Sequence, residues 1–356
     1  MTGRRKLQAL PRPRINKYTN VLFLEANKLI IYLSLNLNMK ICFGSNIVDG
    51  PWGGGNLFLI NLKNYLTASG HIVVFDLSEN DIDLILFTDP RSGKGSNSTI
   101  SKKSIRKYKK KQNPNVKVVQ RINECDERKN TKNINKLYLK ASDIADHVVF
   151  VSSWLQNIYL NLGLNPKKSS VILSGSNQNI FNTIGKTQKP LDRKFKLLTH
   201  HWSSNWMKGF ELYFHIDNLL DHPILKNKIE FTYLGNIDKL YKFRNIKVIP
   251  PLSGYELAEK IKEFDIYVTG SLNEPSGNHH IEAALCGLPI LYIKSGGIPE
   301  YCSNYGLEIT LESFEEKVLY MIEYFEKFNK EMKSYPFNSD LMCSQYLKIF
   351  NELVNQ

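Results

Sequence analysis

The residues of this chain that are best suited to chemistry are two glutamates, Glu274 and Glu282, and the short stretch between them. That stretch contains Gly277, Asn278 and His279, and it joins an apolar, strand-like run to a helical pattern. A glycine lets the backbone approach a ligand closely, and the first amides of a helix are unpaired donors, so the amides near Asn278 and His279 suit a phosphate group. Glu282 can accept two hydrogen bonds from a vicinal diol such as a ribose, and Glu274 can accept one from a sugar hydroxyl.

A lysine–glycine pair, Lys208 and Gly209, ends a second polar loop, which also contains Ser203 and Asn205. A cation at the end of a strand can stabilise the negative charge that gathers on a leaving phosphate. Three successive glycines at 53–55 precede a helical pattern much earlier in the chain, and this makes Gly54 and Gly55 candidates for close contact with a ligand. A glycine triplet is also typical of a plain turn.

Length and composition limit the class of protein. The chain has 356 residues, of which 42% are hydrophobic, and this is enough for two α/β domains and excludes a disordered chain. The five cysteines are scattered and form no CxxC pair, so we expect reduced thiols in a cytoplasmic protein, without a disulfide framework or a zinc site.

The formal net charge of +13 favours an anionic partner. Much of the excess lies in one segment, Lys102–Lys111, which reads KKSIRKYKKK. It is interpreted either as a solvated helix face or mobile loop, or as an attachment site for anionic lipid headgroups on the inner face of a membrane. No nucleic-acid motif accompanies the charge, so we do not expect a nucleic-acid partner.

The positions of the apolar runs predict the domain organisation. Strand-like runs alternate with helical patterns from residue 39 onward, which favours parallel sheets covered by helices on both faces. The predicted fold class is α/β, with two Rossmann-like, doubly wound parallel-sheet domains facing each other across a cleft. The expected parts are an extension that is disordered or not native, a first Rossmann-like domain, a second Rossmann-like domain and a final helix, at residues 1–38, 39–184, 190–335 and 336–356 respectively.

Individual elements are predicted from the same pattern. The strands are expected near 40–43, 72–75, 84–87, 116–119, 148–151, 171–173, 196–199, 231–234, 247–249, 266–268 and 289–293. The helices are expected near 57–66, 133–145, 154–162, 210–220, 255–263, 281–286, 311–328 and 340–353. The polar stretch 185–190 is expected to link the two domains.

The passage from Glu274 onward resembles the retaining glycosyltransferases of family 4, the group 1 glycosyltransferases with the GT-B fold. Their signature is a glutamate, seven residues and a second glutamate, and it is matched here by Glu274 and Glu282 in NEPSGNHHIEAALCGLPI, followed by SGGIPE. The resemblance extends over nearly everything after residue 38. It implies that Glu282 holds the ribose hydroxyls, that Glu274 contacts the donor sugar and that Lys208 grips the diphosphate. It also implies that 39–184 is the acceptor-side domain, that 190–335 is the nucleotide-sugar-binding domain and that the helix in 336–356 crosses back to the first domain.

Two departures from the family are visible. Most members have an arginine five residues before the lysine, and here that position is Ser203, so His201 or Arg121 is expected to supply the missing cation. His201 and its neighbour His200 can equally be core histidines. Many members also have a histidine that touches the donor sugar after a strand of the first domain. None stands here, and Arg121, Asn123 or Asp126 is expected to serve instead.

The resemblance implies sugar transfer from a nucleotide-diphosphate donor, with retention of anomeric configuration and without a metal or other cofactor. A UDP-sugar is the favoured donor, and the acceptor is expected to be a glycan or a lipid-linked molecule. The alternatives are a protein that only binds a nucleotide-sugar or an anionic glycan, and an epimerase or phosphorylase with the same fold. A basic nucleic-acid binder is a weaker alternative.

Overall fold

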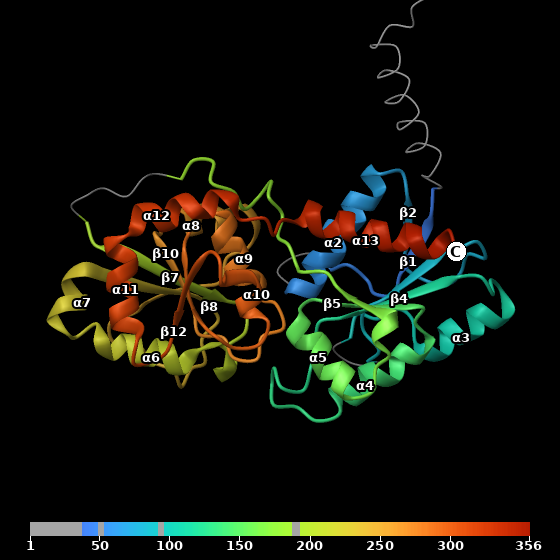
Figure 1. Ribbon diagram of the computed structural model, residues 1–356, viewed down its shortest axis with the longest axis horizontal. Coiled ribbons are helices and arrows are strands. Elements are labelled where there is room, and N and C mark those ends of the chain that lie inside the picture. The colour runs from blue at the N-terminus through green and yellow to red at the C-terminus, as the bar shows by residue number, and fades with distance from the viewer. Residues whose placement is uncertain (1–37, 49–52, 92–95, 187–192) are drawn as a thin grey trace, which may run out of the picture. The chain divides into compact units, whose positions relative to one another are not determined.

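The computed structural model describes residues 38–48, 53–91, 96–186 and 193–356. Within residues 40–356, these ranges contain two parallel six-stranded sheets, each covered by helices on both faces (Figure 1). Residues 1–37 of the expected extension, 1–38, and residues 187–190 of the expected linker, 185–190, lie outside the described residues. No helix in the described ranges is long and apolar enough to cross a bilayer. All five cysteines are buried free thiols.

The first sheet has the strand order β2-β1-β3-β4-β5-β6. Its strands are β1 (Lys40–Phe43), β2 (Ile72–Val74), β3 (Leu84–Phe87), β4 (Lys117–Ile122), β5 (His147–Phe150) and β6 (Ser169–Val171). Its helices are α2 (Gly54–Ala68), α3 (Lys102–Lys111), α4 (Ile134–Ala141) and α5 (Ser153–Asn161). In Figure 1, α2 covers one face of this sheet, and α3, α4 and α5 cover the other.

The second sheet has the order β12-β11-β10-β7-β8-β9. Its strands are β7 (Phe195–His201), β8 (Ile229–Gly235), β9 (Lys247–Ile249), β10 (Ile266–Thr269), β11 (Ile290–Ile293) and β12 (Gly306–Ile309). Its helices are α6 (Phe210–Leu219), α7 (Pro223–Lys228), α8 (Gly254–Lys262), α9 (Asn278–Leu285), α10 (Ile298–Cys302), α11 (Phe314–Glu323) and α12 (Phe325–Glu331).

Two apolar clusters hold this second sheet between its helices. One face of the sheet packs against α8, α9 and α10 through residues such as Leu257, Ile281 and Ile298. The other face packs against α6, α7 and α11 through residues such as Phe210 and Leu225. Because both faces are buried, the central strands are continuous apolar runs, and the sequence pattern of a doubly wound sheet follows from this.

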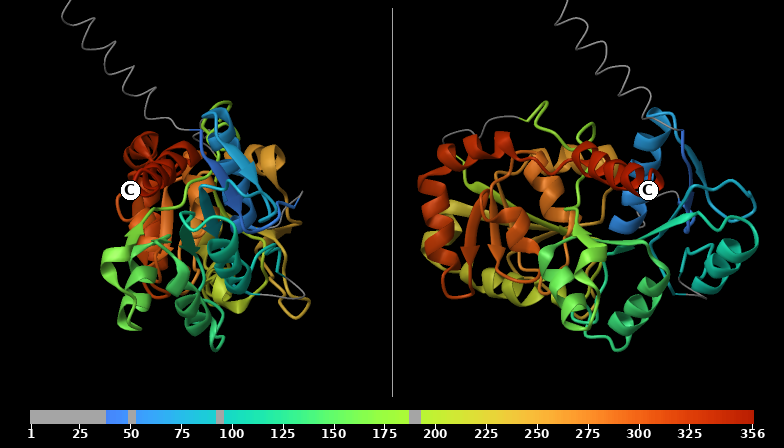
Figure 2. Two further views of the ribbon diagram at one scale, coloured as in Figure 1. Left: turned by 90° about the vertical axis from the view of Figure 1, so that its right-hand side faces the viewer. Right: turned by 45° about the vertical axis from the view of Figure 1, so that its right-hand side comes forward.

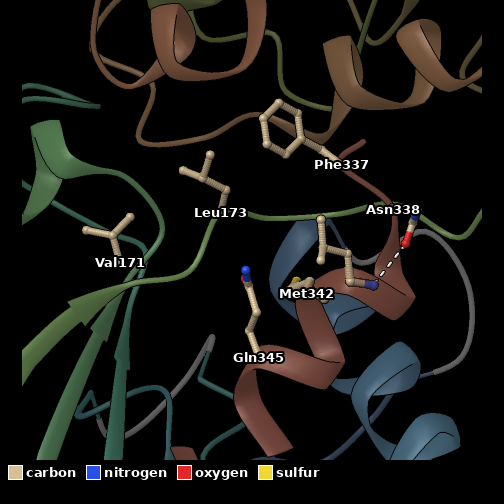
Figure 3. A pocket seen from close by; sticks show the side chains of 7 residues that line it. Val171, Leu173, Phe337, Asn338, Met342 and Gln345 are labelled. Atoms are coloured by element: carbon tan, nitrogen blue, oxygen red, sulfur yellow. Dashed lines mark hydrogen bonds between the residues drawn. The ribbon is translucent and has the colours of Figure 1, made fainter. Parts of the chain in front are cut away.

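The last helix, α13 (Ser339–Val354), packs against α2 of the first sheet, and the rings of Phe58 and Tyr346 lie 5.0 Å apart. The views of Figure 2 show the two helices side by side. Asn338 caps α13 by accepting a hydrogen bond from the Leu341 amide at 2.9 Å. Figure 3 shows this cap beside a small cavity of about 110 Å³. The helix therefore returns from the second sheet to the first.

Several sequence-based element predictions need correction. The sixth strand lies at Ser169–Val171, two residues before the apolar run that predicted it, because Ser169 and Ser170 pair with β5 and the run continues as a loop. The helix predicted at 311–328 is two helices, since Tyr324 leaves the helical region with φ −106° and ψ 28°. The short elements α7, α10 and β12 were not predicted, because each is too brief to show a period.

Candidate functional site

The order of the strands sets the place of the site. The order reverses between β1 and β3 in the first sheet and between β7 and β10 in the second. In doubly wound sheets, ligands bind beyond the carboxyl ends of the strands at such reversals. A pocket of about 730 Å³ lies there, lined by residues that follow β1 and β3 as well as by residues that follow β7 and β10. The lining includes eleven of the residues predicted to belong to the site, namely Gly54, Gly55, Arg121, Ser203, Asn205, Lys208, Glu274, Gly277, Asn278, His279 and Glu282.

The N-terminus of α9 opens into this pocket. Gly277 precedes the helix with a φ of +79°, and a Cβ atom there would lie 2.7 Å from the His279 ring. No side chain caps the helix, so the amides of its first turn stay available to a ligand. The His279 ring itself hydrogen-bonds Thr269 Oγ1 at 3.0 Å, and burial lowers its pKa well below the ordinary value. His279 therefore offers the pocket a neutral ring and its backbone amide.

The N-terminus of α2, on the other side of the pocket, is also without a side-chain cap. A Cβ atom on Gly54 would lie 3.1 Å from the Asn278 side-chain oxygen, and one on Gly55 would lie 3.8 Å from Asn123. The glycines thus allow α2 to approach the start of α9 closely. Two helix N-termini from different sheets meet at one pocket, which gives the pocket a positive potential.

A backbone contact fixes Lys208 at the carboxyl end of β7. It ends a short 3₁₀ turn, Trp206–Lys208, and Gly209 follows with a φ of +101°. A Cβ atom on Gly209 would lie 2.5 Å from the backbone carbon of Gly270, directly after β10. Only glycine allows this approach. The predicted lysine–glycine pair is therefore a structural device that places a cation next to the α9 loop.

Glu274 is buried and has two cationic partners. The Lys208 ammonium donates to its Oε2, and the guanidinium Nε of Arg128 lies 3.2 Å from its Oε1. Burial alone would raise the pKa of Glu274, but Arg128 and Lys208 outweigh it and lower the pKa to about 2. Burial lowers the pKa of Lys208, and Glu274 opposes that shift. The site thus holds an ionised carboxylate between two cations at neutral pH.

Glu282 accepts a hydrogen bond from a neighbouring histidine. Its Oε2 lies 2.9 Å from His200 Nε2, and both side chains are buried. Its other oxygen, Oε1, accepts no hydrogen bond from the described residues. His200 thereby orients the carboxylate and leaves one oxygen of the predicted diol-binding group open to a ligand.

His201 is a core histidine, which is one of the two interpretations left open by the sequence. Its Nε2 contacts Thr199 Oγ1 at 3.1 Å and the Tyr213 hydroxyl at 2.7 Å. Burial lowers its pKa well below the ordinary value, and Lys208 acts in the same direction. A neutral, hydrogen-bonded imidazole does not replace the missing arginine, so His201 is excluded as that cation.

Arg121 is different, because its guanidinium is buried without a counter-ion. The residue is 4% exposed, its Nε has no hydrogen-bond partner, and it forms no ion pair with the described residues. Its guanidinium carbon lies 4.0 Å from the centre of the Phe58 ring on α2. An unpaired buried cation is costly, so a pocket lined by one favours an anionic ligand.

The structure gives local roles to three other candidates. Asp126 accepts hydrogen bonds from the amides of Ile134 and Asn135 at the start of α4, and it does not line the pocket within the described residues. Of the three alternatives given for the contact with the donor sugar, Arg121 and Asn123 line the pocket and Asp126 does not. Asn205 accepts from the Met207 amide at 2.9 Å and so caps the turn that carries Lys208. The Ser203 hydroxyl accepts from the Asn205 amide at 3.3 Å.

Sequence reasoning missed Arg128. It lies in the same polar segment as Arg121 and pairs with Glu124 at 3.2 Å as well as with Glu274. The four-residue spacing of Glu124 and Arg128 was a weak signal for the local ion pair. Nothing in the sequence indicated the contact with Glu274, which lies 146 positions further along the chain.

Comparison with known proteins gives a fold but no family. No protein-family model matches the sequence. No curated protein matches it either. Solved structures do match. The Anabaena protein Alr3699/HepE in complex with UDP and glucose is 16% identical with a TM-score of 0.61, covering 89% of this chain and 98% of that chain.

Two further structures match over similar lengths. A glycosyltransferase from Rickettsia africae ESF-5 is 16% identical with a TM-score of 0.65, covering 90% of this chain and 100% of that one. A sucrose-phosphate synthase from Thermosynechococcus elongatus is 15% identical with a TM-score of 0.62, covering 89% and 99%. The fold is GT-B. Identities this low establish the architecture alone.

The GT-B arrangement explains why the pocket draws on both sheets. Its lining combines the uncapped start of α9 and the carboxylates of the second sheet with the glycines and arginines of the first. Within the described ranges, no group of three or more His, Cys, Asp or Glu side chains is placed to hold a metal ion. The pocket offers amides and cations. Four of the lining cations are paired with carboxylates, namely Arg91, Arg128, Lys129 and Lys208, and Arg121 has no counter-ion among the described residues. This set is suited to a ligand with a diol and a diphosphate.

Proposed function

We propose that this chain is a glycosyltransferase that takes a sugar from a nucleotide-diphosphate donor. The observation that carries the proposal is the convergence of Lys208, Glu274, Glu282 and the uncapped start of α9 on one pocket at the strand-order reversals. These groups come from two separate stretches of the chain, around Lys208 and from Glu274 to Glu282, and each has a part in recognising a nucleotide-sugar. Ordinary surface residues would not be buried together in this way.

In the proposed complex, the first-turn amides of α9 bind the diphosphate at the positive end of the helix. Glu282 accepts from the ribose hydroxyls through Oε1, since His200 occupies the other oxygen. Glu274 accepts from the donor sugar. Lys208 stabilises the negative charge that collects on the diphosphate as the glycosidic bond breaks.

Arg121 is proposed as the cation that stands in for the arginine absent at Ser203. It lines the same pocket, and it has no counter-ion among the described residues. A diphosphate would provide one. The guanidinium can bind two phosphate oxygens at once, as a lysine ammonium cannot.

The finer points of the reaction follow from the resemblance to family 4. We propose transfer with retention of configuration, in which the leaving phosphate oxygen takes the acceptor proton. The protein then contributes positioning and electrostatic stabilisation and needs no metal. UDP-linked sugars are the proposed donors. The HepE structures, which contain UDP and UDP-glucose, lend support to this choice.

The acceptor is proposed to be a glycan or a lipid-linked molecule that the chain meets at a membrane surface. The basic segment is the helix α3, which begins at a capping box between Ser101 and Ser104 and buries Ile105 and Tyr108. Its exposed cations are Lys103, Arg106, Lys107, Lys110 and Lys111. None of these five forms an ion pair within the described residues. Five such charges suit anionic headgroups, at roughly 1 kcal/mol each near the surface.

The membrane proposal has a direct test. Wild type should sediment with vesicles that contain phosphatidylserine but not with neutral phosphatidylcholine vesicles. A variant with Lys107, Lys110 and Lys111 changed to glutamine should stay in the supernatant. Equal sedimentation of both proteins would contradict the proposed attachment, and so would binding that does not weaken with salt.

The donor proposal is tested by thermal shift with UDP, ADP, GDP and their glucose conjugates. A ligand that binds only the folded chain raises the melting temperature. The expected result is a rise for wild type and none for Glu282→Ala with the same ligand. Release of nucleoside diphosphate and transfer of labelled sugar then distinguish an enzyme from a protein that only binds. A wild-type chain that responds to none of these ligands would refute the proposed function.

A further inference from the structure

One buried carboxylate holds two cations that come from different sheets. Lys208 precedes α6 of the second sheet, and Arg128 follows β4 of the first, yet both contact Glu274. Each cation touches its own oxygen, Lys208 at Oε2 and Arg128 at Oε1. The side chain of Glu274 is only 6% exposed, so water contributes little to its solvation.

Arg128 is bound to its own half of the chain as well. Glu124 accepts a hydrogen bond from its Nη1 at 3.2 Å. A second contact links the same two loops, because the side-chain Nδ2 of Asn273 donates to the Glu127 carbonyl at 3.3 Å. Arg128 therefore has two carboxylate partners, whereas Glu274 is the one carboxylate that pairs with Lys208 within the described residues.

The counter-ions of Glu274 decide whether Lys208 can leave it to bind a diphosphate. A buried carboxylate that loses its last counter-ion is strongly destabilised, so Lys208 can move to a phosphate only if another cation stays with Glu274. Arg128 meets this requirement, since its contact with Oε1 does not depend on Lys208. Both cations lower the pKa of Glu274, and either one opposes the effect of burial.

We propose that Arg128 is the permanent counter-ion of Glu274, and that it acts as a positioning residue by freeing Lys208 for the donor diphosphate. This inference rests on the proposed function, and it adds a requirement: Lys208 becomes available only when the loop after β4 lies against the loop after β10. Donor binding is thereby coupled to the contact between the two halves of the pocket.

The test measures the affinity for UDP by titration calorimetry in wild type, Arg128→Met, Glu274→Gln and the double variant. Arg128→Met should weaken UDP binding about tenfold, because Lys208 is then needed by Glu274. Glu274→Gln removes the buried negative charge, so that Lys208 is no longer needed as its counter-ion, and this variant should bind UDP at least as well as wild type. The double variant should match Glu274→Gln, so that the loss caused by Arg128→Met disappears once the carboxylate is gone.

Controls separate this role from others. Lys132→Met removes one positive charge from the same loop at an exposed position that forms no ion pair with the described residues, and it should leave UDP affinity within about twofold. Arg128→Lys should restore part of the affinity lost in Arg128→Met. Melting temperatures of all variants show whether each one folds.

Each remaining outcome counts against the inference. If the double variant binds UDP as weakly as Arg128→Met, then Arg128 contacts the phosphates itself or supports the fold, and the inference is wrong. It is also wrong if Arg128→Met binds UDP like wild type. A wild-type chain that binds none of UDP, ADP and GDP overturns the proposed function, and this inference with it.

Discussion

The two halves of the pocket differ in how their charges are arranged, although both sheets are parallel, six-stranded and covered on both faces. In the second half, the charged and polar site residues have partners: Lys208 pairs with Glu274, and His200 pairs with Glu282. In the first half, Arg91, Arg128 and Lys129 are also paired with carboxylates, but Arg121 is buried with no counter-ion among the described residues.

This difference indicates which half of the pocket has counter-ions for all its buried charges before a ligand binds. A network of paired groups is satisfied before any ligand arrives, so the second half is expected to be stable without the nucleotide, and only Lys208 is expected to shift from Glu274 toward the phosphate on binding. An unpaired buried cation stores unfavourable energy that a ligand relieves, so the first half is expected to gain stability on binding. The predictions that follow test this contrast.

The largest effect is expected from Lys208→Ala in the paired half. It removes the cation beside the leaving diphosphate, and turnover of a nucleotide-sugar should fall about 10²–10³-fold while the fold stays intact. Initial rates of nucleoside diphosphate release measure this. Lys294→Ala is the control, because that lysine is exposed and pairs only with Glu308 at 3.4 Å on the surface. Near-normal turnover in Lys208→Ala would refute the site assignment.

The next largest effect is on the free energy of unfolding, and it is predicted from one glycine in each half of the chain. Gly209 and Gly163 have similar φ values of +101° and +95°. A Cβ atom on Gly209 would meet the Gly270 backbone at 2.5 Å, while one on Gly163 would meet nothing within 4 Å. Gly163→Ala should cost about 1 kcal/mol in the free energy of unfolding, and Gly209→Ala about 2–4 kcal/mol. Denaturant unfolding measures both, and equal losses would show that the close approach at Gly209 is unimportant.

A third prediction concerns acid sensitivity. Burial lowers the pKa of His280 to about 3, and neither ring nitrogen has a hydrogen-bond partner in the part of the chain that the structure describes. In the unfolded chain the ring has the ordinary histidine pKa of about 6.5, so between pH 6.5 and pH 3 the unfolded chain binds more protons than the folded chain. The stability contributed by the neutral ring is therefore complete above about pH 6.5 and is lost as the pH falls toward 3. At pH 5 the loss amounts to about 2 kcal/mol.

His280→Leu should reduce the fall in melting temperature between pH 7.5 and pH 5. It should not abolish that fall, because burial also lowers the pKa values of His201 and His279. His222→Leu, at an exposed position, is the control and should leave the difference in melting temperature unchanged. An unchanged pH dependence in His280→Leu would show that this ring does not contribute to acid lability.

The smallest predicted effect is a change in the stability of the ligand-free chain, and it should have opposite signs for two arginine variants, one in each half of the chain. Arg121→Met keeps an adaptable side chain against Phe58 and removes the unpaired charge, so it should stabilise the ligand-free chain by about 1 kcal/mol while weakening UDP binding about tenfold. Arg193→Met breaks a pair with Asp265 at 2.6 Å and should destabilise the chain. Melting temperatures and UDP titrations measure both effects. A lower melting temperature for ligand-free Arg121→Met would mean that Arg121 already has a favourable partner.

The fold class was predictable from the sequence, and the structure and its GT-B relatives confirm it. Strands buried on both faces must be apolar runs, and helices between them must show one apolar stripe, so both are visible in the order of residues. The short elements α7, α10 and β12 were not predicted. Their positions are set by packing against neighbours rather than by a local pattern.

The sequence by itself determined which groups stand at the strand ends, because glycines, amide-bearing turns and charged residues are local features. Their convergence on one pocket followed from the predicted topology. Only the tertiary structure decided which charges are paired. The contact between Arg128 and Glu274, the neutral state of His201 and the missing counter-ion of Arg121 all depend on distances between segments far apart in the chain. Electrostatic energy depends on separation in space and on burial, and neither is written in the local sequence.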